Sequence, residues 1–120
     1  MKQTPADPTI AVVAHNKKML GGGLPELRAV LRDHGITDPM WFEVPKSRLA
    51  PARVKEALDA GADLILVWGG DGTVQRCIDA MVGSKGSMAI LPAGTANLLA
   101  TNLGIPIDIA GAVKITLVRQ

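Results

Sequence analysis

Short apolar runs alternate with amphipathic stretches along this chain, and this order restricts it to a small set of folds. Four runs are continuous and partly β-branched, as strands buried on both faces of a sheet usually are; they cover residues 9–14, 40–44, 63–68 and 87–91. Between them, apolar side chains recur at helical spacing from Leu24 to before Gly35, over residues 51–60 and over residues 73–82. Strands separated by helices of about ten residues favour a parallel sheet covered by helices on both faces. Further helices are expected at residues 97–103 and from Asp108 onward.

The composition fits one globular domain and excludes several classes of protein. The chain has 120 residues, 48% hydrophobic and 20% charged, and a formal net charge of +2. So small a net positive charge, together with only two Trp, one Phe and no Tyr, argues against a nucleic-acid partner. A single cysteine, Cys77, excludes an internal disulfide framework, and no apolar run approaches the ~18 residues needed to span a bilayer. The N-terminal segment lacks the apolar core of a signal peptide, so we expect a cytoplasmic α/β domain with a flexible segment at residues 1–8.

The segment Gly69-Gly70-Asp71-Gly72-Thr73 runs from the third strand into a helix. Glycines let backbone N–H groups approach an anion closely and adopt positive φ, and a helix N-terminus favours phosphate. An acid inside a phosphate-binding loop is reasonable if it holds Mg²⁺, the role expected for Asp71. The structural alternative is a tight turn followed by a capped helix. The segment is neither a Walker loop nor a dinucleotide fingerprint, because the residues those patterns require are absent.

A second loop, Pro92 to Asn97, also runs from a strand end into a helix. Gly94 permits close approach, while Thr95 and Asn97 supply polar side chains; alternatively, Asn97 only caps the helix. Ligands of parallel sheets bind at the carboxyl ends of the strands, so two such loops are expected to face one pocket.

Taken together, strand-GGDGT-helix and strand-PAGTANLLA-helix-LGIP closely resemble the catalytic domain of diacylglycerol kinases. The first motif also recurs in sphingosine kinases, NAD kinases and phosphofructokinases. The resemblance is most specific between Ala60 and Pro106. It implies a three-layer, doubly wound, mostly parallel, Rossmann-like nucleotide-binding domain, here residues 9–120. It also implies a second, β-rich domain that completes the acceptor site and is absent from this chain.

The resemblance also implies roles for individual residues, with ATP and Mg²⁺ as cofactors. Asp71 would be the catalytic and metal-binding residue. The other nucleotide-binding residues would be Asn16, Gly69, Gly70, Gly72, Thr73, Gly94, Thr95 and Asn97. The chain departs from the family at Lys17 (usually Pro), Arg76 (often Glu) and Leu98 (often Asp). Lys17 and Lys18 are interpreted as solvated surface residues.

We therefore expect the ATP-binding domain of a lipid kinase, inactive alone, that in the whole enzyme phosphorylates a lipid hydroxyl such as that of diacylglycerol. Such an enzyme would act in phospholipid biosynthesis and contact the membrane surface peripherally. A homodimer is left open. The alternatives are a related kinase with a soluble acceptor such as NAD, and a non-catalytic nucleotide-binding or assembly module. Cys77 is expected to be a buried thiol, and Trp41 and Phe42 to point to opposite faces of their strand.

Overall fold

The chain is described by a computed structural model over residues 9–93, together with Ile109 and Gly111. Its centre is a four-stranded parallel sheet in the order β2-β1-β3-β4. The strands are β1 (Ile10–His15), β2 (Met40–Val44), β3 (Leu64–Gly69) and β4 (Ser87–Pro92). The helices are α1 (Leu24–Asp33), the short 3₁₀ helix η1 (Ser47–Leu49), α2 (Ala50–Asp59) and α3 (Asp71–Met81).

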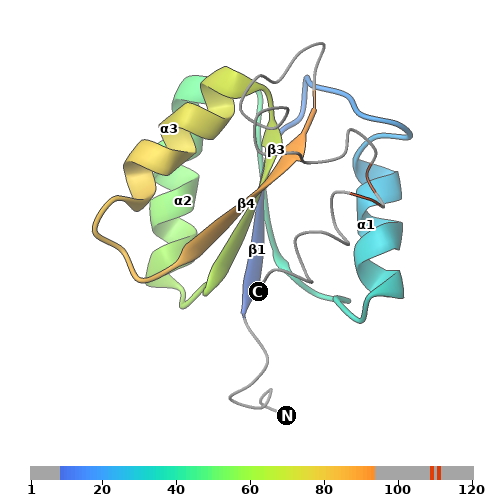
Figure 1. The fold of residues 1–120 in the computed structure, drawn as a ribbon, viewed down its shortest axis with the longest axis horizontal. Coiled ribbons are helices and arrows are strands. Elements are labelled where there is room, and N and C mark those ends of the chain that lie inside the picture. The colour runs from blue at the N-terminus through green and yellow to red at the C-terminus, as the bar shows by residue number, and fades with distance from the viewer. Residues whose placement is uncertain (1–8, 94–108, 110, 112–120) are drawn as a thin grey trace.

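The sheet is the middle of three layers, with α1 on one face and α2 and α3 on the other (Figure 1). Alternate residues of each central strand enter the two cores. Val12 and Leu66 pack with Leu27 of α1, whereas Val13 and Val67 pack on the α2 and α3 side. This two-sided burial explains why β1 and β3 read as continuous apolar runs, and it confirms the predicted α/β class. Trp41 and Phe42 join opposite cores, as predicted.

Glycines end the helices, as the sequence indicated for α1 and α2. Gly35 after α1 and Gly61 after α2 have φ of +85° and +97°, a conformation that side chains disfavour. The amide of Ala62 then donates to the Ala57 carbonyl at 3.0 Å, and that of Ile36 to the Leu31 carbonyl at 2.9 Å. These reversals direct the chain back toward the sheet.

The main difference from the sequence prediction is the start of α3. The helix begins at Asp71, two residues earlier than expected, with Gly70 as the residue that precedes it. An acid in the first helical turn is stabilised by the helix dipole, so Asp71 and Gly72 are helical rather than part of a loop. Ile109 and Gly111 are helical, in the region of the last predicted helix. The segments predicted at residues 1–8, 94–97 and 97–103 lie outside the described residues.

The sheet order fixes where the winding of the chain reverses. The chain passes from β1 outward to β2, then crosses back over β1 to β3 and on to β4. The reversal therefore lies between β1 and β3. In open α/β sheets, ligands bind outside the carboxyl ends of the strands at this point. The loops that follow His15 and Gly69 flank it.

Candidate functional site at the carboxyl edge of the sheet

Gly69 and Gly70 join β3 to α3 at the edge where the parallel strands end. A Cβ on Gly69 would lie 2.7 Å from the Cβ of Thr73, so a side chain does not fit there. Gly70 has φ of −87° and ψ of −170°, which is ordinary extended backbone. The expectation of positive φ in this motif was therefore wrong: close packing, rather than handedness, requires the glycine at position 69.

A hydrogen bond between two hydroxyl groups anchors the first turn of α3. Thr73 is 1% exposed, and its Oγ1 lies 2.9 Å from Oγ of Ser47 in η1. This hydrogen bond connects the segment after β2 to the glycine motif after β3. Sequence reasoning assigned the Thr73 hydroxyl to a ligand and missed Ser47. The position of Ser47 just after a strand end was the only signal that could have indicated it.

The N-terminus of α3 points to the same edge of the sheet. In the part of the chain that the structure describes, no side chain caps this helix, and the amide of Val74 donates to the Gly70 carbonyl at 3.0 Å. Asp71 is partly exposed in the first turn. The first amides of a helix and its dipole together favour an anion. Among the described residues, a Cβ on Gly70 would meet only the Ala93 carbonyl oxygen, at 3.7 Å.

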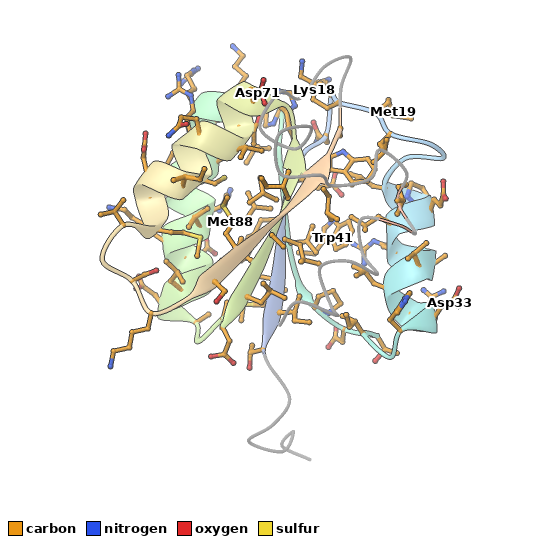
Figure 2. The ribbon with its side chains drawn as sticks, in the orientation of Figure 1. Lys18, Met19, Asp33, Trp41, Asp71 and Met88 are labelled. Carbon is orange, nitrogen blue, oxygen red and sulfur yellow. The ribbon has the colours of Figure 1, made fainter. Side chains whose placement is uncertain are left out.

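The loop after β1 lies at the same edge of the sheet as this helix start, because β1 and β3 are parallel neighbours, and Figure 2 shows Lys18 and Asp71 at that edge. Two buried side chains fix its backbone. Trp68 Nε1 donates to the Lys18 carbonyl at 3.0 Å, and the Lys17 amide donates to Nδ1 of His15 at 3.2 Å. Burial, and then the charge of Lys18, lower the pKa of His15 from its usual 6.5. The neutral imidazole is thus the form that accepts the Lys17 amide. Lys17 and Lys18 are exposed, as predicted.

Asn16 lies at the end of β1 with an exposed side chain. Its Nδ2 donates to Oε1 of Glu43 at 3.4 Å, and the other oxygen of Glu43 accepts from Nε1 of Trp41 at 2.8 Å. Glu43, which sequence reasoning did not single out, therefore connects Asn16 to Trp41. The alternation of β2 places Trp41 and Glu43 on the same face, which is the signal that could have linked them.

A glycine turn at residues 21–23 precedes α1 and forms the start of this helix. Gly21 and Gly23 have φ of +54° and +80°, and the Gly22 amide donates to Oε1 of Glu26 at 2.6 Å. A Cβ on Gly21 would lie 2.8 Å from that oxygen. A carboxylate of the chain itself already satisfies the Gly22 amide, so this turn is a helix start rather than an open anion-binding loop.

The loop after β4 starts next to the glycine motif. The amide of Ala93 donates to the Gly69 carbonyl at 3.1 Å, and Ala93 is buried. The predicted site residues of this loop, Gly94, Thr95 and Asn97, lie outside the described residues. The structure thus brings together Asn16, Gly69, Gly70, Asp71, Gly72 and Thr73 at one edge of the sheet.

Other features bear on what the site could hold. Within residues 9–93, 109 and 111, no three acidic, histidine or cysteine side chains group closely enough to bind a metal by themselves. Cys77 is buried as predicted, and burial raises the pKa of its thiol to about 12, so it is not a nucleophile or ligand. None of the helices described here has the length and apolar character needed to cross a membrane.

Comparison with known proteins decides the family. The family described as the diacylglycerol kinase catalytic domain matches residues 16–120. The chain belongs to this family. The match spans the glycine motif after β3 and begins at Asn16, so it covers the whole of the described site.

The relatives of this family member are named as lipid kinases. A probable lipid kinase YegS-like protein of Klebsiella pneumoniae (strain 342) is 40% identical over 105 residues, which are 83% of this chain and 35% of that protein. A protein of the same name from Pseudomonas putida is 36% identical over 109 residues, 87% of this chain and 36% of the relative. A crystal structure of a diacylglycerol kinase from Bacillus anthracis str. Sterne shares the fold, with a TM-score of 0.77 and 24% identity over 98% of this chain and 44% of that one. The chain thus spans little more than a third of the length of these curated relatives.

Proposed function

We propose that this chain is the ATP-binding domain of a lipid kinase, which transfers the γ-phosphoryl group of Mg²⁺·ATP to a lipid hydroxyl such as that of diacylglycerol. The observation that carries the proposal is the start of α3 after the glycines, which no side chain of the described residues caps, at the place where the winding of the sheet reverses. The family and the names of the relatives support the reaction class.

The residues at this edge fit a nucleotide phosphate. The described residues leave room for an anion beside Gly70, and the first amides of α3 can donate to its oxygens. Asp71 is one partly exposed carboxylate, and Mg²⁺ in phosphoryl-transfer sites is typically held by one or two carboxylates with the substrate phosphates. When bound, Mg²⁺ neutralises the charge of the β- and γ-phosphates. Trp68 and His15 hold the loop after β1 in place, so Asn16 is presented at the carboxyl edge of the sheet.

We further propose that the acceptor site lies outside these 120 residues. Phosphoryl transfer depends mainly on the positioning of donor and acceptor, and the curated relatives are almost three times as long as the matched region. The isolated chain is therefore expected to bind nucleotide without phosphorylating lipid. Phosphorylation of dispersed diacylglycerol by the purified 120-residue chain would contradict this.

Contact with a membrane surface is part of the same proposal. The side chains of Lys18 and Met19 lie at the carboxyl edge (Figure 2), and Met19 is 62% exposed. Lys17, which precedes them in the same loop, is also exposed. Lysines beside an apolar side chain are suited to the interface of an anionic bilayer. This arrangement would bring the nucleotide close to a lipid acceptor.

The test is an amide NMR titration of the chain with Mg²⁺·ATP, with NAD as a parallel ligand. We expect the amides of residues 69–73 and Asn16 to shift together with ATP, and less with NAD. In Asp71→Asn, which keeps the shape of the side chain, the affinity should drop in the presence of Mg²⁺ and stay unchanged in its absence. A non-catalytic module would bind nucleotide equally well with and without the metal, and this result would overturn the kinase proposal. Glu56→Gln, on the outer surface of α2, is the matched control.

A further inference from the structure

A pocket lies away from the glycine motif, between α1 and β2. Seven residues line it: Arg28, Leu31, Arg32, Ile36, Thr37, Pro39 and Trp41. It is a shallow pocket open to solvent, and its empty volume of about 210 Å³ includes part of that open solvent. None of these residues belongs to the loops at the carboxyl edge of the sheet. The pocket therefore lies apart from the glycine motif, and Glu43 joins its Trp41 to Asn16 at the carboxyl edge.

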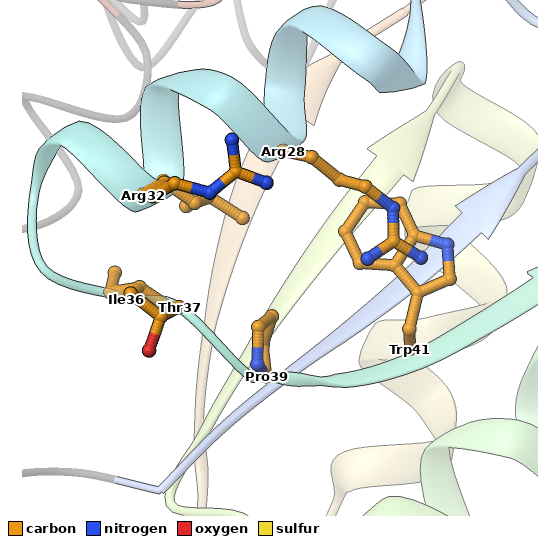
Figure 3. Close-up of a pocket in the computed structure, with 7 residues that line it drawn as sticks. Arg28, Arg32, Ile36, Thr37, Pro39 and Trp41 are labelled. Carbon is orange, nitrogen blue, oxygen red and sulfur yellow. The ribbon is translucent and has the colours of Figure 1, made fainter.

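One of the two arginines is fixed in place by an aromatic ring. The guanidinium carbon of Arg28 lies 3.7 Å from the centre of the Trp41 ring, so the two planes are in contact (Figure 3). The ring is itself held, because Trp41 Nε1 donates to Glu43 at 2.8 Å. Stacking orients a guanidinium while leaving the N–H groups at its edge available as donors. Arg28 is thus pre-oriented for a ligand that accepts two parallel hydrogen bonds.

The second arginine adds charge to the same pocket. Arg32 follows Arg28 by one helical turn, so both lie on the same face of α1. Within the described part of the chain, neither guanidinium forms an ion pair with a carboxylate. Two like charges four residues apart on a helix destabilise it unless an anion lies between them. Thr37 contributes a hydroxyl group to the wall of the pocket.

We propose that this pocket binds a phosphate group. Two guanidinium groups match the charge of a phosphate dianion, and a fixed guanidinium edge matches its geometry. Because Arg28 covers the ring of Trp41, the pocket presents cationic edges rather than an open aromatic face. This arrangement favours an anion over a stacked base. The phosphate could belong to a lipid headgroup or to a soluble phosphate compound.

The two tryptophans allow a direct test by NMR. The indole N–H signal of Trp41 reports on the pocket, while that of Trp68, which is bonded to the Lys18 carbonyl and precedes Gly69, reports on the proposed nucleotide site. The chain is titrated with inorganic phosphate, and with chloride at matched ionic strength. We expect the Trp41 signal to shift in a saturable way with phosphate and not to shift with chloride. Binding at the glycine motif would instead shift the amides of residues 69–73, so the failure of one proposal is distinguishable from the failure of the other.

The variants are chosen so that the fold is retained. Arg32 is exposed and stacks on no ring in the described structure, so Arg32→Gln should fold normally and bind phosphate about tenfold more weakly. Arg32→Lys keeps the charge and loses the planar fork, so its affinity for phosphate should lie between those of the unmodified chain and Arg32→Gln. Arg53→Gln on α2, an exposed arginine on the other face of the sheet, should bind like the unmodified chain. Equal binding by Arg32→Gln, an equal shift with chloride or no shift at all would overturn the proposal.

Vesicles identify the source of the phosphate. Sedimentation is compared for phosphatidylcholine vesicles with and without phosphatidic acid. If Arg32→Gln also weakens binding to the vesicles with phosphatidic acid, the pocket binds a lipid headgroup. If Arg32→Gln weakens only the binding of free phosphate, the ligand is a soluble phosphate compound. Either result supports a phosphate site.

Discussion

At the scale of single residues, the glycines of one motif have different physical roles. A Cβ on Gly69 would clash at 2.7 Å with the Cβ of Thr73, which is 1% exposed and bonded to Ser47. Among the described residues, the nearest atom to a Cβ on Gly72 would be Oγ of Ser47, at 3.9 Å. The sequence pattern identified both as candidate phosphate contacts. It could not separate them, because the reason for Gly69 is a packing contact that exists only in three dimensions.

Stability measurements should separate these two glycines. Gly69→Ala should lower the free energy of unfolding by about 1–3 kcal/mol, because Thr73 cannot move away without breaking its bond to Ser47. Gly72→Ala should leave it unchanged or raise it by about 0.5 kcal/mol, since alanine is the better helix former. Urea unfolding of the two variants checks this. A Gly69→Ala protein as stable as the unmodified chain would show that the packing argument is wrong.

At the scale of elements, the strands could be predicted well and the start of α3 could not. β1 and β3 are buried on both faces, and such runs have clear limits in the sequence. The start of α3 depends on whether Asp71 and Gly72 adopt helical backbone, and glycine carries little preference of its own. The loop after β1 was predicted only as a loop. The bonds of Trp68 to Lys18 and of His15 to Lys17 join elements that the sequence does not show to be neighbours.

This loop should respond to acid through His15. Burial and Lys18 lower its pKa below 6.5, the value expected in the unfolded chain, so the unfolded chain binds more protons in that range. The free energy of unfolding should therefore fall as the pH drops below 6.5, and protonation should weaken the Nδ1 contact with the Lys17 amide. Chemical unfolding across this range, together with hydrogen exchange of residues 16–20, measures both effects.

Two variants assign the effect to one histidine. His15→Gln cannot titrate and should lose most of this dependence on pH. His34→Gln, which replaces the exposed histidine at the end of α1, should keep it. If His34→Gln removes the dependence instead, His15 is not the group responsible.

At the scale of the whole molecule, the order of the strands makes the site. Chain order predicted a parallel sheet with helices on both faces, but it did not give the position of β1 between β2 and β3. That position places the reversal of winding between His15 and Gly69, so residues far apart in sequence meet at one edge. Because all four strands are parallel, their other ends meet at the opposite edge, about 20 Å away for strands of this length.

A paramagnetic nucleotide complex tests this arrangement directly. With Mn²⁺·ATP in place of Mg²⁺·ATP, amide signals near the metal broaden, and the effect decreases steeply with distance. Signals of Asn16 and residues 70–73 should disappear first, because the carboxyl ends of β1 and β3 lie next to each other. Signals of Asp63 and Ser87, at the opposite edge, should remain sharp at the same concentration. Uniform broadening at both edges would mean that the ion binds without a defined site. Broadening confined to the opposite edge would place the nucleotide away from the glycine motif and would contradict the proposed function.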